Sequence, residues 1–169
     1  MGDDIDIRAY DRTHVRDGFA CGVERIDNYF DQNAWKEQKA HKIRVFCATL
    51  PDSQLVVGYY SLTFVVWTDE GIADALKPKF VKSGLAVPAI YLPKLGVRET
   101  HAGKGIGRLL VRDAFQRSLA IADNAAIGTL CLDAIDTEKA DWYQGLGFEP
   151  FADGDLRMVM PLNVLRKAA

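Results

Sequence analysis

Residues 95–110 read Leu95-Gly-Val-Arg-Glu-Thr-His-Ala-Gly-Lys-Gly-Ile-Gly-Arg-Leu-Leu110. A strand-like segment leads into a short loop, and three glycines at alternate positions then open an amphipathic run. In this run Ile106, Leu110 and Ala114 recur at a spacing of four, which is the spacing of one face of an α-helix. The pattern predicts a strand, a glycine-rich loop and a helix over residues 103–123.

The glycine-rich loop is predicted to bind a diphosphate. Glycine has no Cβ, so an anion can approach the backbone closely at Gly103, Gly105 and Gly107. The first N–H groups of a helix have no partner within the helix and lie at the positive end of its dipole. Lys104 and Arg108 can add charge-assisted hydrogen bonds.

Two other glycine-rich motifs do not fit this loop. A Rossmann GxGxxG fingerprint would need glycine in place of Arg108 and an acidic residue at the end of a following strand, a role that Asp123 does not fit. A P-loop needs Gly-Lys-Ser/Thr, whereas Lys104 is followed by Gly105. A third interpretation, in which the glycines serve only a tight turn, stays open, although turns rarely need three glycines.

The rest of the chain alternates between strand-like and helix-like segments. Strands are predicted at residues 5–10, 43–50, 54–67, 89–97, 129–133, 148–151 and 157–161. Helices are predicted at residues 23–41 (one or two helices), 103–123 and 137–144, with a short helix and irregular loop at 70–88. Turn residues at 51–53 and 152–155 should join the strands on either side into antiparallel hairpins.

These elements predict an α/β (α+β) fold, with a mixed, mostly antiparallel sheet of six to seven strands flanked by helices. Residues 89–133 form a strand-helix-strand unit, and its two strands should be parallel because a crossover helix returns the chain in the same direction. With 169 residues and no internal repeat or linker, the chain is expected to form a single domain over residues 1–169.

The composition excludes several classes of protein. Three cysteines without a CxxC pair predict reduced thiols, with neither a zinc site nor a disulfide framework. The acidic start, Met1-Gly-Asp-Asp-Ile-Asp6, lacks the apolar core of a secretory signal, and Leu62–Trp67 is much too short to span a bilayer. We therefore expect a cytoplasmic protein with no metal and no membrane partner.

Basic residues gather locally although the formal net charge is −2. One cluster contains Lys36, Lys39, His41, Lys42 and Arg44, and another contains Lys77, Lys79 and Lys82. Such clusters usually form solvated surface. The alternative is a local site for an anionic partner, which the net charge does not exclude.

The loop Ala102-Gly-Lys-Gly-Ile-Gly107 resembles the acetyl-CoA-binding motif of the GCN5-related N-acetyltransferase superfamily, Gln/Arg-x-x-Gly-x-Gly/Ala. The resemblance implies an acetyl-CoA-dependent N-acetyltransferase whose loop, from Ala102 to Arg108, binds the co-substrate. Ala102 departs from the Gln or Arg of the motif, which removes one side-chain contact. The resemblance also implies that the backbone of Leu95, Gly96 and Val97 meets the pantetheine arm. There the Val97 N–H would polarise the thioester carbonyl, as in an oxyanion hole.

A second motif of the superfamily lies in Asp136-Thr-Glu-Lys-Ala-Asp-Trp-Tyr-Gln-Gly-Leu-Gly-Phe148, where Tyr143, Gly147 and Phe148 match the spacing. The resemblance implies that Tyr143 gives a proton to the departing CoA thiolate, since a phenol stays protonated at neutral pH. Taken alone, a helical tyrosine is more often a packing residue. Asp136 stands where relatives often carry Asn or Ser near the cofactor, so it is included among the cofactor-binding residues.

A general base for the amine is not identified by the sequence. His14, His41 and Glu99 are candidates by residue type alone, and each is more simply explained as an ordinary surface residue. An amine that arrives neutral, or one that loses its proton through water, needs no such base. We assign none.

The first half of the chain narrows the resemblance to one subgroup. The matching segments are His14-Val-Arg-Asp-Gly-Phe-Ala-Cys-Gly-Val-Glu-Arg-Ile-Asp-Asn-Tyr-Phe30, Ala34, Arg44-Val-Phe46 and Val56-Val-Gly-Tyr-Tyr-Ser-Leu62. They resemble toxins of toxin–antitoxin modules that acetylate the amino group of aminoacyl-tRNA. The resemblance implies aminoacyl-tRNA as the acceptor, an antitoxin and a second copy of the chain as partners, and the basic clusters as a track for tRNA phosphates.

Two other functions stay open on the sequence. The same direct attack of a primary amine on acetyl-CoA would serve a small amine, an amino acid or a protein N-terminus. A catalytically silent module that binds CoA or a protein is favoured only by Ala102. Tyr143 and the complete glycine loop argue against this last alternative.

Overall fold

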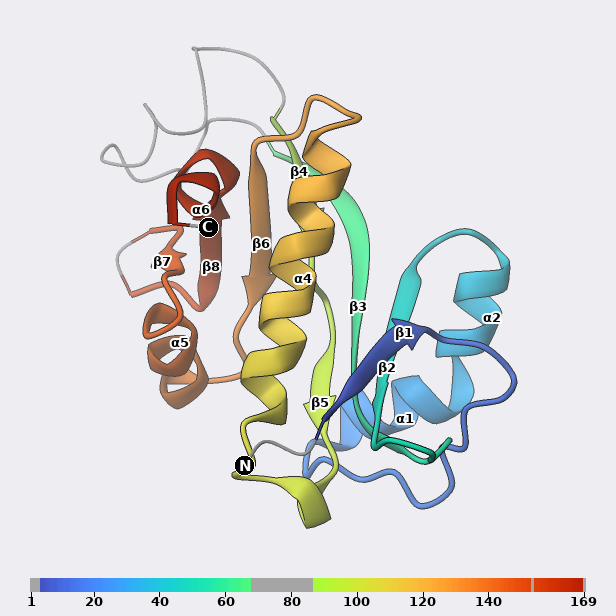
Figure 1. Cartoon of the computed structure of the whole chain (residues 1–169). Helices are drawn as coiled ribbons and strands as arrows, with labels where there is room; N and C mark the ends of the chain where they lie inside the picture. The colour runs from blue at the N-terminus through green and yellow to red at the C-terminus, as the bar shows by residue number, and fades with distance from the viewer. Residues whose placement is uncertain (1–3, 68–86, 153, 169) are drawn as a thin grey trace. The chain divides into compact units, whose positions relative to one another are not determined.

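The computed structural model describes residues 4–67, 87–152 and 154–168 (Figure 1). The chain divides into two compact units. The first unit consists of Met1–Thr63 with Pro93–Ala114, and the second of Phe64–Leu92 with Phe115–Ala169. The basic cluster at Lys77–Lys82 lies outside the described residues, as does almost all of the short helix and loop predicted at 70–88. One domain over residues 1–169 stays a prediction.

The first unit is an antiparallel sheet with helices inserted after its first strand. Its strands are hydrogen-bonded in the order β1 (Asp6–Ala9), β2 (Arg44–Thr49), β3 (Val56–Trp67, up to Thr63 in this unit) and β5 (Leu95–Val97). Its helical elements are α1 (Glu24–Gln32), α2 (Ala34–Lys39), the 3-10 helix η1 (Glu99–His101) and the first half of α4 (Ile106–Ala122). The hairpin predicted from residues 43–50 and 54–67 is confirmed by the pairing of β2 with β3.

Helix α1 packs on β3 through aromatic side chains. Ile26 and Phe30, four residues apart on one helix face, are both buried. The Phe30 ring stacks on Tyr59 with the ring centres 4.2 Å apart. The Tyr59 hydroxyl donates to the Ile26 carbonyl at 2.7 Å, so the backbone of the helix is also tied to the strand.

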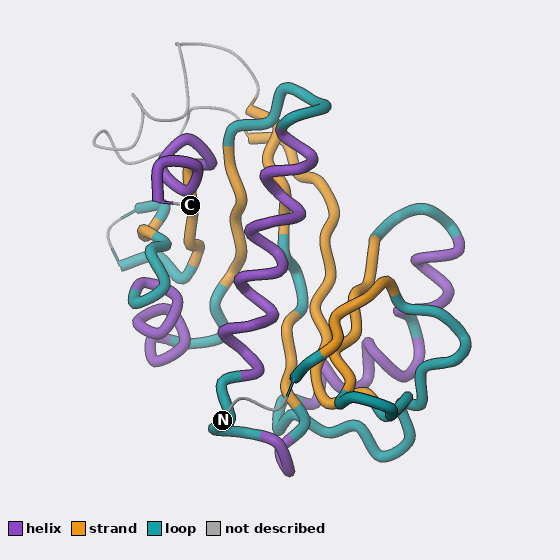
Figure 2. Tube along the Cα trace, viewed as in Figure 1, coloured by secondary structure: helices purple, strands orange, loops and turns teal. Residues whose placement is uncertain are grey.

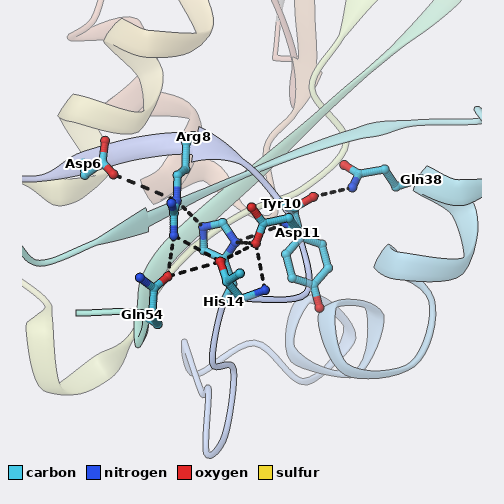
Figure 3. A network of polar contacts seen from close by, with 8 residues as sticks. Asp6, Arg8, Tyr10, Asp11, His14, Gln38 and Gln54 are labelled. Carbon is cyan, nitrogen blue, oxygen red and sulfur yellow. Dashed lines mark hydrogen bonds and ion pairs between the residues drawn. The ribbon is translucent and has the colours of Figure 1, made fainter. Parts of the chain in front are cut away.

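Helix α2 is held to the sheet by a buried glutamine (Figure 3). The Gln38 side-chain amide donates to the Tyr10 carbonyl at 2.7 Å, and its oxygen accepts the Val45 N–H at 2.9 Å. The side-chain amide therefore gives a hydrogen-bond partner to two backbone groups, the Tyr10 carbonyl after β1 and the Val45 N–H in β2. These two hydrogen bonds fix the position of α2, and with it the exposed residues of this helix.

The second unit contains both parallel and antiparallel strand pairings. Its own strands are hydrogen-bonded in the order β4 (Val87–Tyr91), β6 (Thr129–Asp133), β8 (Arg157–Pro161) and β7 (Glu149–Pro150). Strands β4 and β6 are parallel, as predicted for the crossover, and the β7–β8 hairpin is also confirmed. Two more helices are α5 (Thr137–Gln144) and α6 (Leu162–Ala168). Ala89, Cys131 and Val159 are at the centre of the unit's core.

The mixed, mostly antiparallel fold is confirmed, but the segment predicted as one strand at 89–97 is two strands. The break falls at Pro93, which has no N–H to donate. Before it, the Leu92 N–H donates to Cys131 in the second unit; after it, the Lys94 carbonyl accepts from Ser61 in the first. The described residues therefore contain eight strands instead of six or seven. Helix α6 follows β8 directly and was not predicted.

The cysteines are free thiols, as expected. Burial raises the pKa of Cys21 to about 12, with the neighbouring Asp27 adding to the shift. The described residues hold no group of three or more His, Cys, Asp or Glu side chains placed to bind a metal ion. Of the helices that the structure describes, none has the length and apolar character needed to cross a bilayer.

Gly58 on β3 is predicted to be required for the packing of α4. A Cβ at this position would lie 3.1 Å from Ile106 Cγ2, 3.1 Å from Leu110 Cδ1 and 3.3 Å from the Gly96 carbonyl oxygen. We expect Gly58→Ala to lower the free energy of unfolding by about 1–3 kcal/mol through overpacking. Gly128→Ala is the matched control, because a Cβ there meets nothing within 4 Å. Equal midpoints of denaturant unfolding for the two variants would contradict the prediction.

Candidate active site

The glycine-rich loop is exposed and contains two left-handed residues. Gly103 has φ +75° and Gly105 has φ +82°, a region that side chains with a Cβ rarely adopt. A Cβ at either position would meet nothing within 4 Å, so open space lies above the backbone. Figure 2 shows this segment as irregular chain between η1 and α4. The helix therefore begins at Ile106, three residues later than predicted, because the two left-handed glycines precede it.

The loop presents a row of backbone donors to solvent. Leu109 is the first residue of α4 whose N–H forms a helical hydrogen bond, which it donates to the Gly105 carbonyl at 3.2 Å. For the N–H groups of the four preceding residues, 105–108, no hydrogen bond is recorded within the described part of the chain. The Ala102 N–H differs, because it donates to the Glu99 carbonyl at 3.0 Å. The exposed side chains of Lys104 and Arg108 flank the row.

Strand β5 has alternate backbone groups free. The Arg98 N–H donates to Val57 and the Ser61 N–H to Lys94, which sets the ladder so that Gly96 exchanges hydrogen bonds with Tyr59. The N–H groups of Leu95 and Val97 therefore point away from β3. Among the residues that the structure describes, neither of these two groups has a recorded partner. The N–H groups of Leu95 and Val97 are thus available to a bound group, whereas the N–H of Gly96 is not. The role of the Val97 N–H that the resemblance implies stays a prediction.

Gly96 instead serves packing. A Cβ on it would lie 3.0 Å from Ile26 Cγ2 and 3.1 Å from Cys21 Sγ, so this face of β5 is closed by the α1 region. Gly58, which pairs with Val97, faces Ile106 and Leu110 of α4 on the other side. The two faces of the first unit's sheet are therefore covered by different helices.

Arg98 has a structural role that the sequence analysis missed. Its side chain is buried, and its guanidinium donates to the carbonyls of Val56 (2.9 Å), Gly18 (2.8 Å) and Asp17 (3.1 Å). It thereby holds the end of β5 and the chain before α1 in place. A charged residue directly after an apolar strand was the signal that could have indicated this role.

Tyr143 and Asp136 lie on α5 in the second unit. Asp136 is the N-cap, and its carboxylate accepts the Lys139 N–H at 2.8 Å. Tyr143 is 8% exposed and packs against the rings of Trp142 and Phe148. Burial raises the pKa of Tyr143, so the phenol stays protonated at physiological pH. No hydrogen bond to its hydroxyl is recorded from the described residues.

The three candidates for a general base are in different surroundings. His14 is not the surface residue that was expected: its ring is fully buried, with Nδ1 3.1 Å from Asp11 Oδ1 and Nε2 3.3 Å from Arg8 Nε (Figure 3). His41 is exposed in a turn with φ +57°, and Glu99 is exposed in η1. None of these placements identifies a base, so none is assigned.

Comparison with known proteins finds relatives along almost the whole chain. The probable toxin TacT of Sinorhizobium fredii (strain NBRC 101917 / NGR234) is 31% identical over 160 residues, which cover 90% of this chain and 88% of the relative. A tRNA-acetylating toxin of Mycobacterium tuberculosis (strain ATCC 25618 / H37Rv) is 29% identical over 150 residues, or 88% of this chain and 86% of the relative. No family model matches the chain.

Solved structures agree with the fold. A tyrosine-to-phenylalanine mutant of KacT has a TM-score of 0.89 at 17% identity, covering 98% of this chain and 99% of that one. AtaT complexed with acetyl-methionyl-tRNAfMet has a TM-score of 0.86 at 18% identity, with the same coverage. A tyrosine-to-phenylalanine mutant of AtaT bound to acetyl-CoA and the C-terminus of the antitoxin AtaR has a TM-score of 0.81 at 18% identity, covering 98% of each chain.

Proposed function

We propose, from the premise that this chain belongs to the tRNA-acetylating toxin family of the GCN5-related N-acetyltransferases, that it transfers the acetyl group of acetyl-CoA to the amino group of an aminoacyl-tRNA. Acetylation removes the nucleophilic amine that peptide-bond formation requires. The proposal includes a cytoplasmic location, an antitoxin partner and a second copy of the chain. The relatives that support the acceptor are the tRNA-acetylating toxin of M. tuberculosis and AtaT with its acetylated tRNA.

The observation that carries the proposal is the exposed row of amides at the start of α4. Free N–H groups at residues 105–108, beside two left-handed glycines, suit a diphosphate, since each phosphate oxygen can accept from the backbone without a side chain in the way. Lys104 and Arg108 supply positive charge for the same anion. Acetyl-CoA carries such a diphosphate and is the donor substrate in this proposal.

The reaction then depends on two further groups. The Val97 N–H donates to the thioester carbonyl oxygen, and a donor of this kind contributes about 3 kcal/mol to transition-state stabilisation. The amine nitrogen forms the new bond to the acetyl carbon while the carbon–sulfur bond breaks. Tyr143 gives its proton to the departing sulfur, and the proton that the amine loses passes to water. The Leu95 backbone, also free on the same edge of β5, holds the pantetheine arm.

The experiment that tests this function is acetyl transfer by the purified full-length chain. Aminoacyl-tRNAs charged with each amino acid in turn are incubated with acetyl-CoA, and the aminoacyl groups released from the tRNA are analysed by mass. We expect at least one of them to gain an acetyl group. If no aminoacyl-tRNA is acetylated while a free amine or a protein N-terminus is, the acceptor assignment is wrong although the chemistry is right.

The basic cluster at α2 is proposed as part of the tRNA track. Lys36, Lys39, Lys42 and Arg44 are all exposed, and the only acid within the cluster, Glu37, accepts the Tyr29 hydroxyl at 2.8 Å. Local positive charge on a rigid helix suits RNA phosphates.

Charge reversal at Lys36 and Lys39 is therefore expected to lower kcat/KM for aminoacyl-tRNA by about tenfold or more at low salt. The difference from wild type should shrink as salt rises, with the slope of log(kcat/KM) against log[salt] falling by about 0.7–0.9 per lost contact. Reversal of Lys139 on α5 and Lys167 on α6 is the matched control, because it changes the net charge equally on exposed helical lysines. Equal losses for the two double variants would show that only net charge matters.

A further inference from the structure

Lys94 is a half-buried cation directly before β5. Its Nζ lies 5.1 Å from the centre of the Tyr29 ring of α1. Within the described residues, no hydrogen bond or ion pair to this ammonium is recorded. Burial lowers the pKa of Lys94, and the nearby positive charge of Arg25 lowers it further. The three N–H donors of the Lys94 ammonium are thus partly desolvated and have no strong acceptor within the described residues.

The one acid that acts on Lys94 is already engaged. Glu37 acts to raise the pKa of Lys94, but its Oε2 accepts the Tyr29 hydroxyl at 2.8 Å, and no ion pair with the ammonium is recorded among the described residues. The Lys94 ammonium is therefore held over the Tyr29 ring without a carboxylate partner, in the positive field of Arg25. A partly buried charge without an anionic partner is unfavourable in the free protein and becomes favourable when an anion binds to it.

The position of Lys94 in the sheet shows from which side that anion comes. Side chains alternate along a strand, so Lys94 shares a face with Gly96, the face that packs against Ile26 and Cys21. The glycine-rich loop opens α4, which covers the opposite face. Lys94 therefore does not contact the anion that the loop holds.

We propose that Lys94 binds a backbone phosphate of the 3′-terminal nucleotides of aminoacyl-tRNA and so positions the amine at β5. This inference rests on the proposed function. Lys94 is three residues from Val97, or about 10 Å along the strand. The nucleotide that carries the aminoacyl group must lie within such a distance of the Val97 N–H. A lysine ammonium, a compact point charge with three donors, suits a phosphate that approaches without a fixed orientation.

The test compares two acceptors of the full-length chain. The first is an aminoacyl-tRNA that the wild type acetylates, and the second is the same amino acid esterified to adenosine, which has no phosphate. Lys94→Met keeps the aliphatic packing on Tyr29 but removes the charge. We expect kcat/KM for the tRNA to fall roughly tenfold, mainly through KM, because one charged hydrogen bond is lost. Activity on the adenosine ester and the Kd for acetyl-CoA should stay within about twofold of wild type.

Two control variants complete the design. Lys94→Arg keeps the charge and should retain most of the activity on tRNA. Lys167→Met, on the exposed end of α6, removes one charge without touching the site and should behave as wild type. The salt dependence of kcat/KM for Lys94→Met should weaken by about 0.7 in slope, the value for one single-strand phosphate contact.

Each other outcome overturns the proposal. Equal losses on both acceptors would mean that Lys94 shapes β5 instead of binding a phosphate. Weaker acetyl-CoA binding with unchanged KM for tRNA would assign Lys94 to a phosphate of CoA. An active wild type with an unaffected Lys94→Met variant would remove only the role of Lys94, whereas a wild type inactive on every aminoacyl-tRNA would remove the proposed function and this inference together.

Discussion

Gly105→Glu is expected to lower the affinity of the chain for acetyl-CoA on the order of 100-fold or more. Gly105 has φ +82°, and its amide stands in the row that we propose for the diphosphate. A glutamate would fill the open space above the loop and place a negative charge against a polyanion. It would also be held in the left-handed region at a cost of about 1–2 kcal/mol, which favours rearrangement of the amides. Calorimetric titration with acetyl-CoA measures the effect.

Two further variants distinguish the effect of the glutamate side chain at position 105 from the effect of backbone strain there. Gly105→Ala carries the same strain without the carboxylate, so a smaller loss of about three- to tenfold is expected. Gly154→Glu places the same side chain at another open left-handed glycine, φ +74°, in a turn of the second unit. This variant should bind acetyl-CoA as wild type does. If Gly105→Glu retains wild-type affinity, the diphosphate lies elsewhere and the enzyme assignment loses its main support.

Tyr143→Phe is expected to lower the turnover number by about 10²–10⁴-fold, the range for loss of a general acid. The Kd for acetyl-CoA should change by less than about twofold, because the ring and its packing against Phe148 are kept. Stability should hardly change either, since no partner of the hydroxyl is recorded among the described residues. Single-turnover acetyl transfer and denaturant unfolding measure the two effects.

Tyr59→Phe is the matched control for this substitution. The Tyr59 hydroxyl is buried and donates to the Ile26 carbonyl at 2.7 Å, so its removal should cost about 1–2 kcal/mol of stability. Its effect on turnover should be far smaller than that of Tyr143→Phe. A Tyr143→Phe variant with full turnover would show that another group, or water, protonates the thiolate.

The expected pH dependence of the reaction follows from the burial of Tyr143. Burial raises the pKa of Tyr143 above the ordinary value for tyrosine, so the acid stays protonated throughout the range of the assay. The rate should therefore rise with pH as the acceptor amine loses its proton, and ionisation of Tyr143 should produce no falling limb below about pH 10.

Local patterns in the chain were sufficient for most of the fold. The helix from Ile106, the β2–β3 hairpin and the parallel pairing of β4 with β6 follow from apolar spacing, turn residues and crossover geometry. These features depend on neighbours in the sequence. The break at Pro93 was missed because the strands on either side of it pair with different parts of the chain, which periodicity does not report.

For the candidate site, the sequence predicts an anion-binding loop and leaves the surrounding geometry open. The glycine spacing indicates an anion-binding loop, and the structure adds two left-handed glycines and the row of free amides. The ladder register of β5, by contrast, decides that Val97 has a free N–H and that Gly96 does not. His14, expected at the surface, is buried by contacts with Arg8 and Asp11.

The sequence by itself therefore determined the class of fold and the position of the loop that opens α4, because these depend on short-range spacing and residue type. Only the tertiary structure decided which backbone groups of β5 are free, which face carries Lys94, and that Glu37 is engaged by Tyr29. Those properties depend on hydrogen-bond register and on burial, and both are set by contacts between strands and helices that are distant in the sequence.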